Sequence, residues 1–421
     1  GRREIGRKSD KARGLSHFGM GTMFACLRHV GRQPIAKLLP ALSKVFEKLI
    51  VKKFILPLVK NKVDYSQFAY ISRPGSGTTC ALVLTYHKIL EFLDRHSGAV
   101  RLLSIDFSKA FDKLLHSTIL SACSYFSFPP FLMKWIVSFL SSRTQRVCFA
   151  DNVSSWSAVT SGIPQGSILG PVLFCLAINS LSPLCSNSMY VKYADDVSVL
   201  HFVRDSIDDD LQTEWEHIVQ WSVSVSLPIN FLKCKVLNIV TKQDMCLSEI
   251  VLSDGTTLDE VQSLSFLGVI LSHDMKWNAH INRTVKKACK RMFIMYNLRR
   301  SGCSEQLIFQ SYCAFIRSVL LYAFPAWCNV PAYLSWKLCV VERRVMRIIG
   351  SSTLFPSLLD VAEKTCFKLM KSVFTFDSHP LRTMFKTRPV INTRSSLHLY
   401  APFTRTTRFK KSFIKYCKFE S

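Results

Sequence analysis

Acidic residues are scarce in this sequence. Only 29 aspartates and glutamates stand against 55 lysines and arginines, which gives a formal net charge of +26. Such an imbalance opposes folding by self-repulsion, and an anionic partner usually offsets it. Nucleic acid is the usual partner, because cationic side chains that bind phosphates release counterions. An anionic membrane surface is the alternative partner.

Paired cysteines and a long apolar run are also missing. None of the 15 cysteines belongs to a Cys-x-x-Cys pair, so neither a zinc knuckle nor a redox dithiol is supported. An odd, irregular set is typical of reduced thiols in an intracellular protein, with nucleus and cytoplasm not distinguished. Prolines and glycines interrupt the apolar stretch 163–178, and no signal peptide follows the charged start. We therefore expect no membrane partner.

The chain does have enough apolar material for a large core. With 421 residues and 48% hydrophobic content, it is expected to fold into two or three subdomains and not to stay disordered. It shows no repeat at solenoid periods. The absence of an initiator methionine suggests a fragment of a longer product.

An acidic dipeptide lies inside an apolar pattern at residues 189–201. Strand-forming residues flank Asp195 and Asp196 on both sides, which predicts two short strands with the carboxylates at the bend. Two neighbouring like charges repel each other, and a divalent cation would remove that cost. An ordinary Asp-Asp turn is the alternative.

A second acid, Asp106, ends the buried-strand pattern at residues 100–107. A loop rich in glycine and proline at residues 161–171, which leads into a helix, separates it from the dipeptide. The chain therefore runs from a strand that ends in an acid, through a loop and a helix, to the Asp-Asp hairpin.

These segments resemble a known family. SIDFSKAFD, SGIPQGSILGP and YADD, in that order, closely resemble the palm motifs of reverse transcriptases. PIAKLLPALSKVFEKLI, LPINFLKC and SFLGVILS make the chain similar to the non-LTR (LINE-like) retrotransposon branch, and the resemblance covers residues 32–281. It implies an RNA-directed DNA polymerase that extends a DNA primer 3′-hydroxyl with dNTPs on an RNA template. It implies no obligate protein partner.

The resemblance also implies the fold, an α+β right-hand polymerase with fingers, palm and thumb. The expected parts are a basic N-terminal arm at 1–31, part of the fingers at 32–102, a palm with an antiparallel sheet and an inserted fingers segment at 103–275, a helical thumb at 276–380, and a basic tail at 381–421. The tail interleaves cations with Phe403, Phe409, Phe413 and Tyr416, on which bases could stack. A solvated basic tail is the alternative.

A two-metal site is part of what the resemblance implies. We expect Asp106 and Asp195 to bridge two Mg²⁺ ions, with Asp196 in support and Mn²⁺ as a substitute ion. Lys233 matches the family lysine that protonates pyrophosphate. Asp112 is expected to be structural. The acids at 205–210 are expected to suit the dipole of a helix start.

The nucleotide and primer contacts come from the same motifs. Phe111 matches an aromatic residue that blocks a ribose 2′-hydroxyl, and a core phenylalanine is the alternative. Arg73 lies in a loop before a helix, where an anion site and an ordinary capped turn both stay open. Residues 265–271 are expected to form one strand whose glycine admits the primer. The expected nucleotide contacts are Arg73, Phe107, Phe111, Gln165 and Gly166, and the expected primer contacts are Phe266, Leu267 and Gly268.

Two other functions stay open. The chain could be a nucleic-acid binder of the same fold that has lost activity, and the imperfect match around Arg32 fits that reading. An RNA-copying RNA polymerase is disfavoured by Phe111, because such enzymes leave room for the ribose at the equivalent place.

Overall fold

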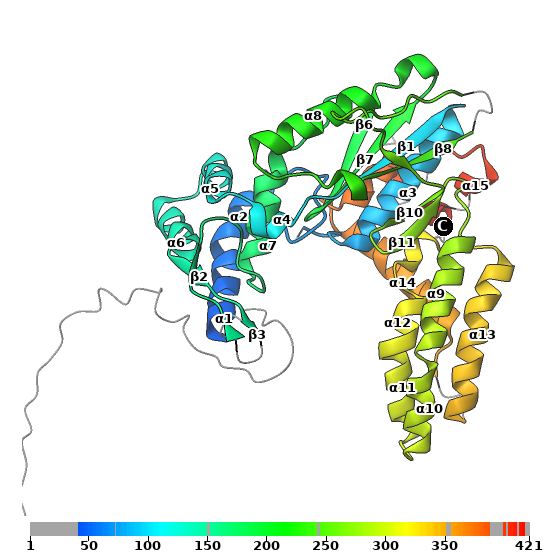
Figure 1. Cartoon of the computed structure of the whole chain (residues 1–421). Coiled ribbons are helices and arrows are strands. Elements are labelled where there is room, and N and C mark those ends of the chain that lie inside the picture. The colour runs from blue at the N-terminus through cyan, green and yellow to red at the C-terminus, as the bar shows by residue number, and fades with distance from the viewer. Residues whose placement is uncertain are drawn as a thin grey trace, which may run out of the picture.

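The computed structural model describes residues 41–71, 73–149, 152–241, 245–350, 355–387, 399–400, 403–410 and 412–416. The expected basic arm and the Arg32 region lie outside the described residues, as do parts of the expected tail. Figure 1 shows a central sheet, with most of the helices from the first 180 residues gathered on one side and a long helical bundle from the last third of the chain on the other. The helix at Thr78–Arg95 is the exception, because it packs between the sheet and the bundle.

The central sheet has five strands in the order β6-β7-β1-β8-β9. Their bounds are β6 Ser188–Tyr193, β7 Asp196–Val203, β1 Ala99–Ile105, β8 Lys235–Val240 and β9 Asp259–Glu260. The first four strands pair antiparallel, and only the short β9 joins in parallel. The expected antiparallel sheet, and with it the α+β class, is confirmed.

Strand β1 is covered on both faces, which explains its almost uninterrupted apolar sequence. Successive side chains of a strand point to opposite faces. Accordingly, Leu102 belongs to a core that includes α3 (Thr78–Arg95) and the C-terminal bundle, whereas Leu103 belongs to a core that includes α7 (Leu169–Ala177) and α8 (Leu211–Ser224). The sheet therefore separates two hydrophobic cores and connects them through its alternating residues.

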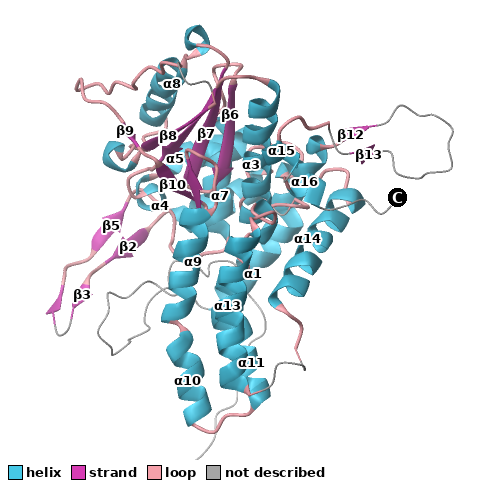
Figure 2. Ribbon diagram, turned by 90° about the vertical axis from the view of Figure 1, so that its right-hand side faces the viewer, coloured by secondary structure: helices cyan, strands magenta, loops and turns pink. Residues whose placement is uncertain are grey.

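Short helices from the segments before and after β1 gather on one side of the sheet. They are α1 Ala41–Ile50, a π-helical turn at Val51–Ile55, α2 Leu56–Val59, α4 Ala110–Lys113, α5 His116–Tyr125 and α6 Pro130–Leu140. Beyond α6 the chain forms a ribbon in which β2 (Arg143–Gln145) pairs with β5 (Ser157–Val159), and β3 (Cys148–Phe149) pairs with β4 (Asn152–Val153). Figure 2 shows this ribbon projecting away from the body.

A small hairpin connects the sheet to the bundle, where the sequence predicted one strand. β10 (Ser263–Phe266) turns at Leu267 and Gly268 and pairs with β11 (Val269–Ser272). Both turn residues have positive φ, +44° and +83°, and the glycine adopts this region without strain. The prediction of a single strand is therefore wrong, because Gly268 makes the turn between two strands and does not lie inside one strand.

The C-terminal bundle is helical, as the sequence predicted from Trp277 onward. Its elements are α9 Asn278–Lys290, α10 Met292–Arg300, α11 Glu305–Tyr312, a π-helical turn at Cys313–Arg317, α12 Ser318–Leu320, α13 Ala332–Ile349 and α14 Leu358–Thr375. Among the described residues, one continuous helical run, Glu305–Ala326, is long and apolar enough to cross a membrane. Its Ile308, Ile316 and Leu320 are fully buried in the bundle core, whereas its Leu307 and Phe315 are exposed. In all, 39% of its most apolar window is buried within the protein.

The expected basic tail is in part a folded segment. Phe409 and Phe413 are 1% and 4% exposed, and both belong to the core that α3 shares with the bundle. Phe409 also contacts the ring of His87, at 5.2 Å between centroids. These two rings cannot stack on bases, so that part of the prediction is wrong. Phe403 remains 79% exposed, whereas nothing is described for the side chain of Tyr416.

Asp94 of α3 fastens this segment. Its carboxylate accepts the backbone N–H groups of Arg405, at 2.9 and 3.0 Å, and of Thr406, just before the short helix α15 (Thr407–Lys410). Burial alone would raise the pKa of Asp94, but these N–H groups outweigh burial and hold the pKa below its ordinary value.

Asp94→Ala should lower the free energy of unfolding by about 1–3 kcal/mol at neutral pH, because the N–H groups of a packed segment lose their acceptor. A carboxyl with a lowered folded pKa stabilises the protein above its ordinary pKa, and this contribution is lost as pH falls through the folded value. The difference from wild type in chemical denaturation should therefore shrink below about pH 4. A difference that is independent of pH would contradict the charge-assisted bond.

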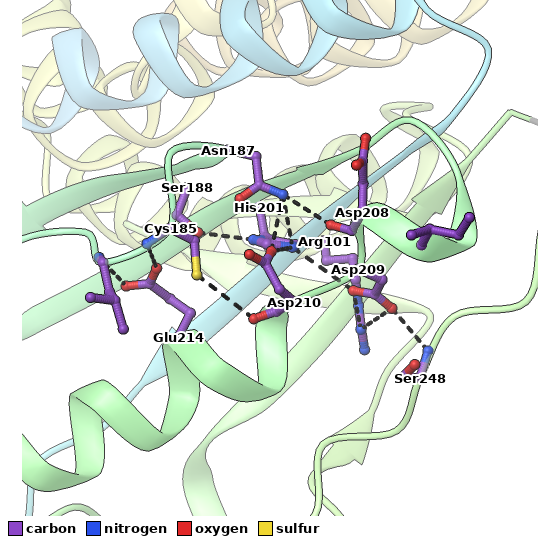
Figure 3. A network of polar contacts seen from close by, with 12 residues as sticks. Arg101, Cys185, Asn187, Ser188, His201, Asp208, Asp209, Asp210, Glu214 and Ser248 are labelled. Carbon is purple, nitrogen blue, oxygen red and sulfur yellow. Dashed lines mark hydrogen bonds and ion pairs between the residues drawn. The ribbon is translucent and has the colours of Figure 1, made fainter.

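A buried polar network holds the end of the sheet that lies away from Asp106 (Figure 3). Arg101 of β1 donates to both carboxylate oxygens of Asp209, at 2.8 Å each, and to Oδ1 of Asn238 at 3.1 Å. His201 of β7 contacts Asp210 at 3.1 Å and Ser188 at 2.9 Å. Burial lowers the pKa of His201 against the opposing pull of Asp210 and Asp209.

The network corrects the interpretation of the acids at 205–210. Asp205 does cap a single helical turn, at Ser206–Asp208, by accepting the N–H of Ile207. The side chain of Asp209, however, is completely buried. It serves a tertiary ion pair, whereas the sequence predicted only an interaction with a helix dipole.

Asp209→Ala should destabilise the protein by about 3–5 kcal/mol, because Arg101 would stay buried without its partner. The double variant Arg101→Met/Asp209→Leu removes both charges together and should recover most of that loss in urea denaturation. If the double variant is as unstable as the single one, the loss comes from packing and not from an uncompensated charge.

Candidate active site

The acidic dipeptide lies at the tip of the hairpin between β6 and β7. Tyr193 pairs with Asp196, so that Ala194 and Asp195 form a two-residue turn. Ala194 has a φ of +55°, a region that a residue with a side chain enters only at some cost. Asp195 and Asp196 are both exposed. The predicted pair of strands with the carboxylates at the bend is confirmed.

The sheet brings Asp106 to the same place. Ile105 of β1 pairs with Val197 of β7, and the next position along each strand is Asp106 and Asp196 respectively. The two carboxylates thus come from neighbouring strands, although they are far apart in the sequence. The antiparallel register, which the sequence alone does not specify, sets this arrangement.

Electrostatic repulsion links the three acids. Partial desolvation raises the pKa of the Asp196 carboxyl, although the residue as a whole is exposed, and the neighbouring charges of Asp195 and Asp106 raise this pKa further. Oδ2 of Asp106 is inaccessible to solvent and accepts no hydrogen bond. The cation described near it is Nζ of Lys233, at 3.4 Å. The site therefore carries more negative charge than its surroundings neutralise.

Lys233 reaches Asp106 through a tight backbone arrangement. The N–H of Asn230 donates to the carbonyl of Asp106 at 2.7 Å, and the N–H of Asp106 contacts Sγ of Cys234 at 3.4 Å. These contacts place the helical turn Phe231–Lys233 beside the end of β1. The side chain of Lys233 is 67% exposed, so the ion pair is weak and the ammonium is free to move.

The donor set fits a hard divalent cation, although the ligands are not gathered around one point. Carboxylate oxygens are what Mg²⁺ prefers. A cation would relieve the mutual repulsion of the acids and would supply a partner to Oδ2 of Asp106, which accepts no hydrogen bond and has only a weak ion pair with Lys233 in the described structure. Within the part of the chain that the structure describes, however, no three His, Cys, Asp or Glu side chains are close enough together to hold a metal.

The loop that follows the projecting ribbon and carries Gln165 packs against the short helix α4, which carries Phe111. The N–H of Ile163 donates to the carbonyl of Phe111 at 2.7 Å, and Nε2 of Gln165 donates to Oδ1 of Asp112 at 3.0 Å. Gly162 has a φ of +77°, and a Cβ there would stand 2.5 Å from the carbonyl oxygen of Asp112. Only glycine fits this approach, which fixes the loop against α4.

The ring of Phe111 packs on Phe174 of α7, with 4.6 Å between centroids, but stays partly exposed. It thus has a core contact and an accessible face. Gln165 and Gly166 are exposed on the loop. Asp112, expected to be structural, accepts the hydrogen bond that orients Gln165.

Glu47 supports the same loop and was not predicted from the sequence. This α1 residue is 1% exposed, and its Oε2 accepts the N–H groups of Ile168 and Leu169 at 2.7 and 3.1 Å. It therefore caps the start of α7 from a distant part of the chain. A lone glutamate on a predicted amphipathic helix gives no signal of such a contact.

Three of the expected contacts are placed differently by the structure. Arg73 is 8% exposed, and its guanidinium donates to the carbonyls of Val63, Asp64 and Gln67 at 3.2, 2.8 and 2.7 Å. It is therefore already bound to a turn of the backbone, and an anion would have to compete for it. The side chains of Phe107 and Phe266 are buried in the two cores, so neither ring is exposed to a nucleotide or a primer.

The turn at Leu267 and Gly268 rests on the bundle. The hydroxyl of Tyr322 donates to the carbonyl of Leu267 at 2.9 Å, and a Cβ on Gly268 would stand 3.2 Å from the ring of Tyr322. Gly268 is exposed. Of the expected primer contacts, Gly268 remains exposed, whereas the carbonyl of Leu267 is bonded to Tyr322.

Comparisons with known proteins agree with the motifs. The chain is 27% identical over 254 residues to the RNA-directed DNA polymerase from mobile element jockey of Drosophila melanogaster, covering 58% of this chain and 27% of that protein. It is 26% identical over 290 residues to the probable RNA-directed DNA polymerase from transposon X-element of the same species, covering 65% and 31%. The chain thus spans about a third or less of these relatives.

Among solved structures, apo telomerase from Candida tropicalis aligns with a TM-score of 0.41 at 12% identity, over 80% of this chain and 61% of that chain. Nothing about function follows at that level of similarity. The family match decides the assignment, because residues 32–271, more than half of the chain, match the reverse transcriptase (RNA-dependent DNA polymerase) family. They include Asp106, the loop with Gln165, and the Asp195-Asp196 hairpin. The chain therefore belongs to the reverse transcriptase family.

Proposed function

We propose that this chain is the polymerase part of a non-LTR retrotransposon protein and that it extends a DNA primer with dNTPs on an RNA template. The observation that carries the proposal is that adjacent strands bring Asp106, Asp195 and Asp196 to the same end of the sheet, where Oδ2 of Asp106 is buried without a hydrogen bond. Free cysteines in the described part of the chain fit an intracellular location.

Asp106 and Asp195 would hold two Mg²⁺ ions, with Asp196 in support, and Mn²⁺ could replace Mg²⁺. When bound, the ions activate the primer hydroxyl and stabilise the leaving pyrophosphate. Lys233 supplies a proton donor beside Asp106, at 3.4 Å from its carboxylate. Its exposed ammonium would turn from the carboxylate to the pyrophosphate oxygen and protonate it.

Phe111 and Gln165 would surround the incoming nucleotide. The partly exposed ring of Phe111 presents a carbon face, and the loop that carries Gln165 and Gly166 is fixed against the same short helix. Arg73 would contribute indirectly, by holding the turn whose carbonyls it binds. A direct contact with the triphosphate would require its guanidinium to leave those carbonyls.

The C-terminal bundle offers a basic surface for the template–primer duplex. Arg283, Lys286, Lys287 and Lys290 are exposed along α9, and the whole chain has a net charge of +26. Phosphate contacts by such residues make binding tight at low salt and weaker as salt increases. The bundle would thus hold the duplex without reading its sequence.

The test of the proposal is primer extension on a homopolymeric RNA template with Mg²⁺ and with Mn²⁺. Asp195→Asn should reduce the rate of single-nucleotide addition by at least about 10³-fold, because an amide cannot replace an anionic metal ligand. Duplex affinity in chelator should stay within about twofold. Equal extension by the variant would exclude this site. Duplex binding by wild type without any extension would favour a nucleic-acid binder that has lost activity.

Phe111→Val should admit ribonucleotides. A 2′-hydroxyl against the Phe111 ring would meet carbon and lose its hydrogen bonds, at a cost of about 1–3 kcal/mol, which corresponds to roughly tenfold to a hundredfold discrimination. The measurement is single incorporation of dATP and ATP opposite template uridine, with most of the gain expected in kcat/KM for ATP. Wild type that uses ATP as readily as dATP would leave Phe111 with only its core contact to Phe174.

A further inference from the structure

The chain just before α3 covers the outer edge of β6, the strand that leads into the acidic hairpin. Gln67 forms a parallel bridge with Lys192. The N–H of Phe68 donates to the carbonyl of Lys192 at 2.9 Å, and the N–H of Lys192 donates to the carbonyl of Ser66 at 2.8 Å. This segment, residues 64–69, therefore extends the ladder beside the hairpin without being a named strand.

Gln67 reaches beyond that ladder to the hairpin tip. Its Oε1 accepts the N–H of Ala69 at 2.9 Å and the N–H of Ala194 at 3.3 Å, and the residue is 2% exposed. Because both neighbours are donors, the oxygen and the nitrogen of this amide cannot be exchanged. Ala194 is the turn residue with a φ of +55°, directly before Asp195.

The segment that carries Gln67 is itself held firmly. The ammonium of Lys192 is 0% exposed and donates to Oδ2 of Asp64 at 3.1 Å and to the carbonyl of Leu181. Arg73 binds the carbonyls at both ends of the same turn, those of Val63 and Gln67. The backbone that carries Gln67 is therefore held in place by Arg73 and by the Lys192–Asp64 pair.

The other end of the amide has no partner. Nε2 of Gln67 is buried and makes no hydrogen bond in the described structure, which is a cost that an apolar side chain of the same size would avoid. A leucine or methionine would fill this place in the core at least as well. What glutamine adds at this position is an acceptor oxygen for the N–H groups of Ala69 and Ala194.

We propose that Gln67 is a positioning residue for the catalytic hairpin: its Oε1 holds the N–H of Ala194 and thereby keeps the left-handed turn that aims the carboxylate of Asp195. The inference rests on the proposed function and adds a residue outside the metal ligands. Without this acceptor, the turn relaxes toward a more populated backbone conformation, and the carboxylates present a less defined set of oxygens to a cation.

The test measures metal binding apart from catalysis. Gln67→Met keeps the volume and removes the acceptor, and Mn²⁺ titration followed by electron paramagnetic resonance, without nucleic acid, should show about 10- to 100-fold weaker binding. Extension should require correspondingly more Mg²⁺ and approach the wild-type rate at saturating metal. Gln212→Met is the matched control, since Gln212 also accepts a backbone N–H, that of Val251 at 2.9 Å, but on the remote helix α8.

A rescue variant separates positioning from general stability. Glycine adopts a φ of +55° without strain, so adding Ala194→Gly to Gln67→Met should restore most of the lost Mn²⁺ affinity. If Gln67→Met lowers the melting temperature but leaves Mn²⁺ affinity unchanged, the residue is only structural and the proposal fails. The same conclusion follows if the glycine restores nothing.

Two further measurements cover the remaining outcomes. If Gln67→Met does not fold, Gln67→Asn keeps an amide in the core and withdraws the oxygen by one methylene, and it should show the same weaker Mn²⁺ binding. If wild type neither binds Mn²⁺ nor extends a primer, the proposed function fails by itself. Hydrogen exchange of the Ala194 amide then decides the inference: faster exchange in the Gln67 variant supports it, and equal exchange overturns it.

Discussion

Repulsion among carboxylates is the constraint on which this part of the structure depends. Asp106, Asp195 and Asp196 lie at one end of adjacent strands, where partial desolvation and then the charges of Asp195 and Asp106 raise the pKa of Asp196. A protein left to minimise its energy would separate them. Here the register of β1 with β7, and the turn at Ala194, hold them in place. The sheet thus keeps three like charges near one another, with the exposed Lys233 as a weak counterion at Asp106.

Two ion pairs away from the acids hold the strands that carry them. At the far end, Arg101 and Asp209 join β1 to the start of α8 with both side chains almost fully buried. Along the outer edge, Lys192 and Asp64 tie β6 to the segment before α3. Burial lowers the pKa of Lys192, whereas Lys192 and Ser66 outweigh the effect of burial and lower the pKa of Asp64. Removing Asp64 alone would leave the ammonium of Lys192 buried without its counterion, whereas Asp64 is itself one-third exposed.

Local patterns predicted the elements better than they predicted the contacts. The alternation around Asp195, the apolar run that ends at Asp106 and the helices after Trp277 all depend on neighbouring residues, and each appears in the structure. The roles of Asp209, Glu47 and Arg73 depend on partners far away in the chain. The sequence around a single acid or arginine does not indicate whether its side chain faces solvent or a buried partner. The family motifs could locate the candidate site, but not the residues that support it.

For the basic tail and for the hairpin at Leu267, the sequence predicts a structure that differs from the observed one. In both cases the prediction depends on one local property: the density of cations in the tail, and the apolar run around Gly268. Beyond residue 381 the density of cations concealed an apolar pattern, in which Phe409, Phe413 and Ile414 are all buried. Charge describes what a surface attracts, whereas the spacing of apolar residues determines which side chains enter a core. In this segment the aromatic rings pack in the core shared with α3, while Asp94 holds the backbone. A segment with the composition of a nucleic-acid-binding arm can therefore also belong to the fold that supports the site, and only its tertiary contacts separate the two roles.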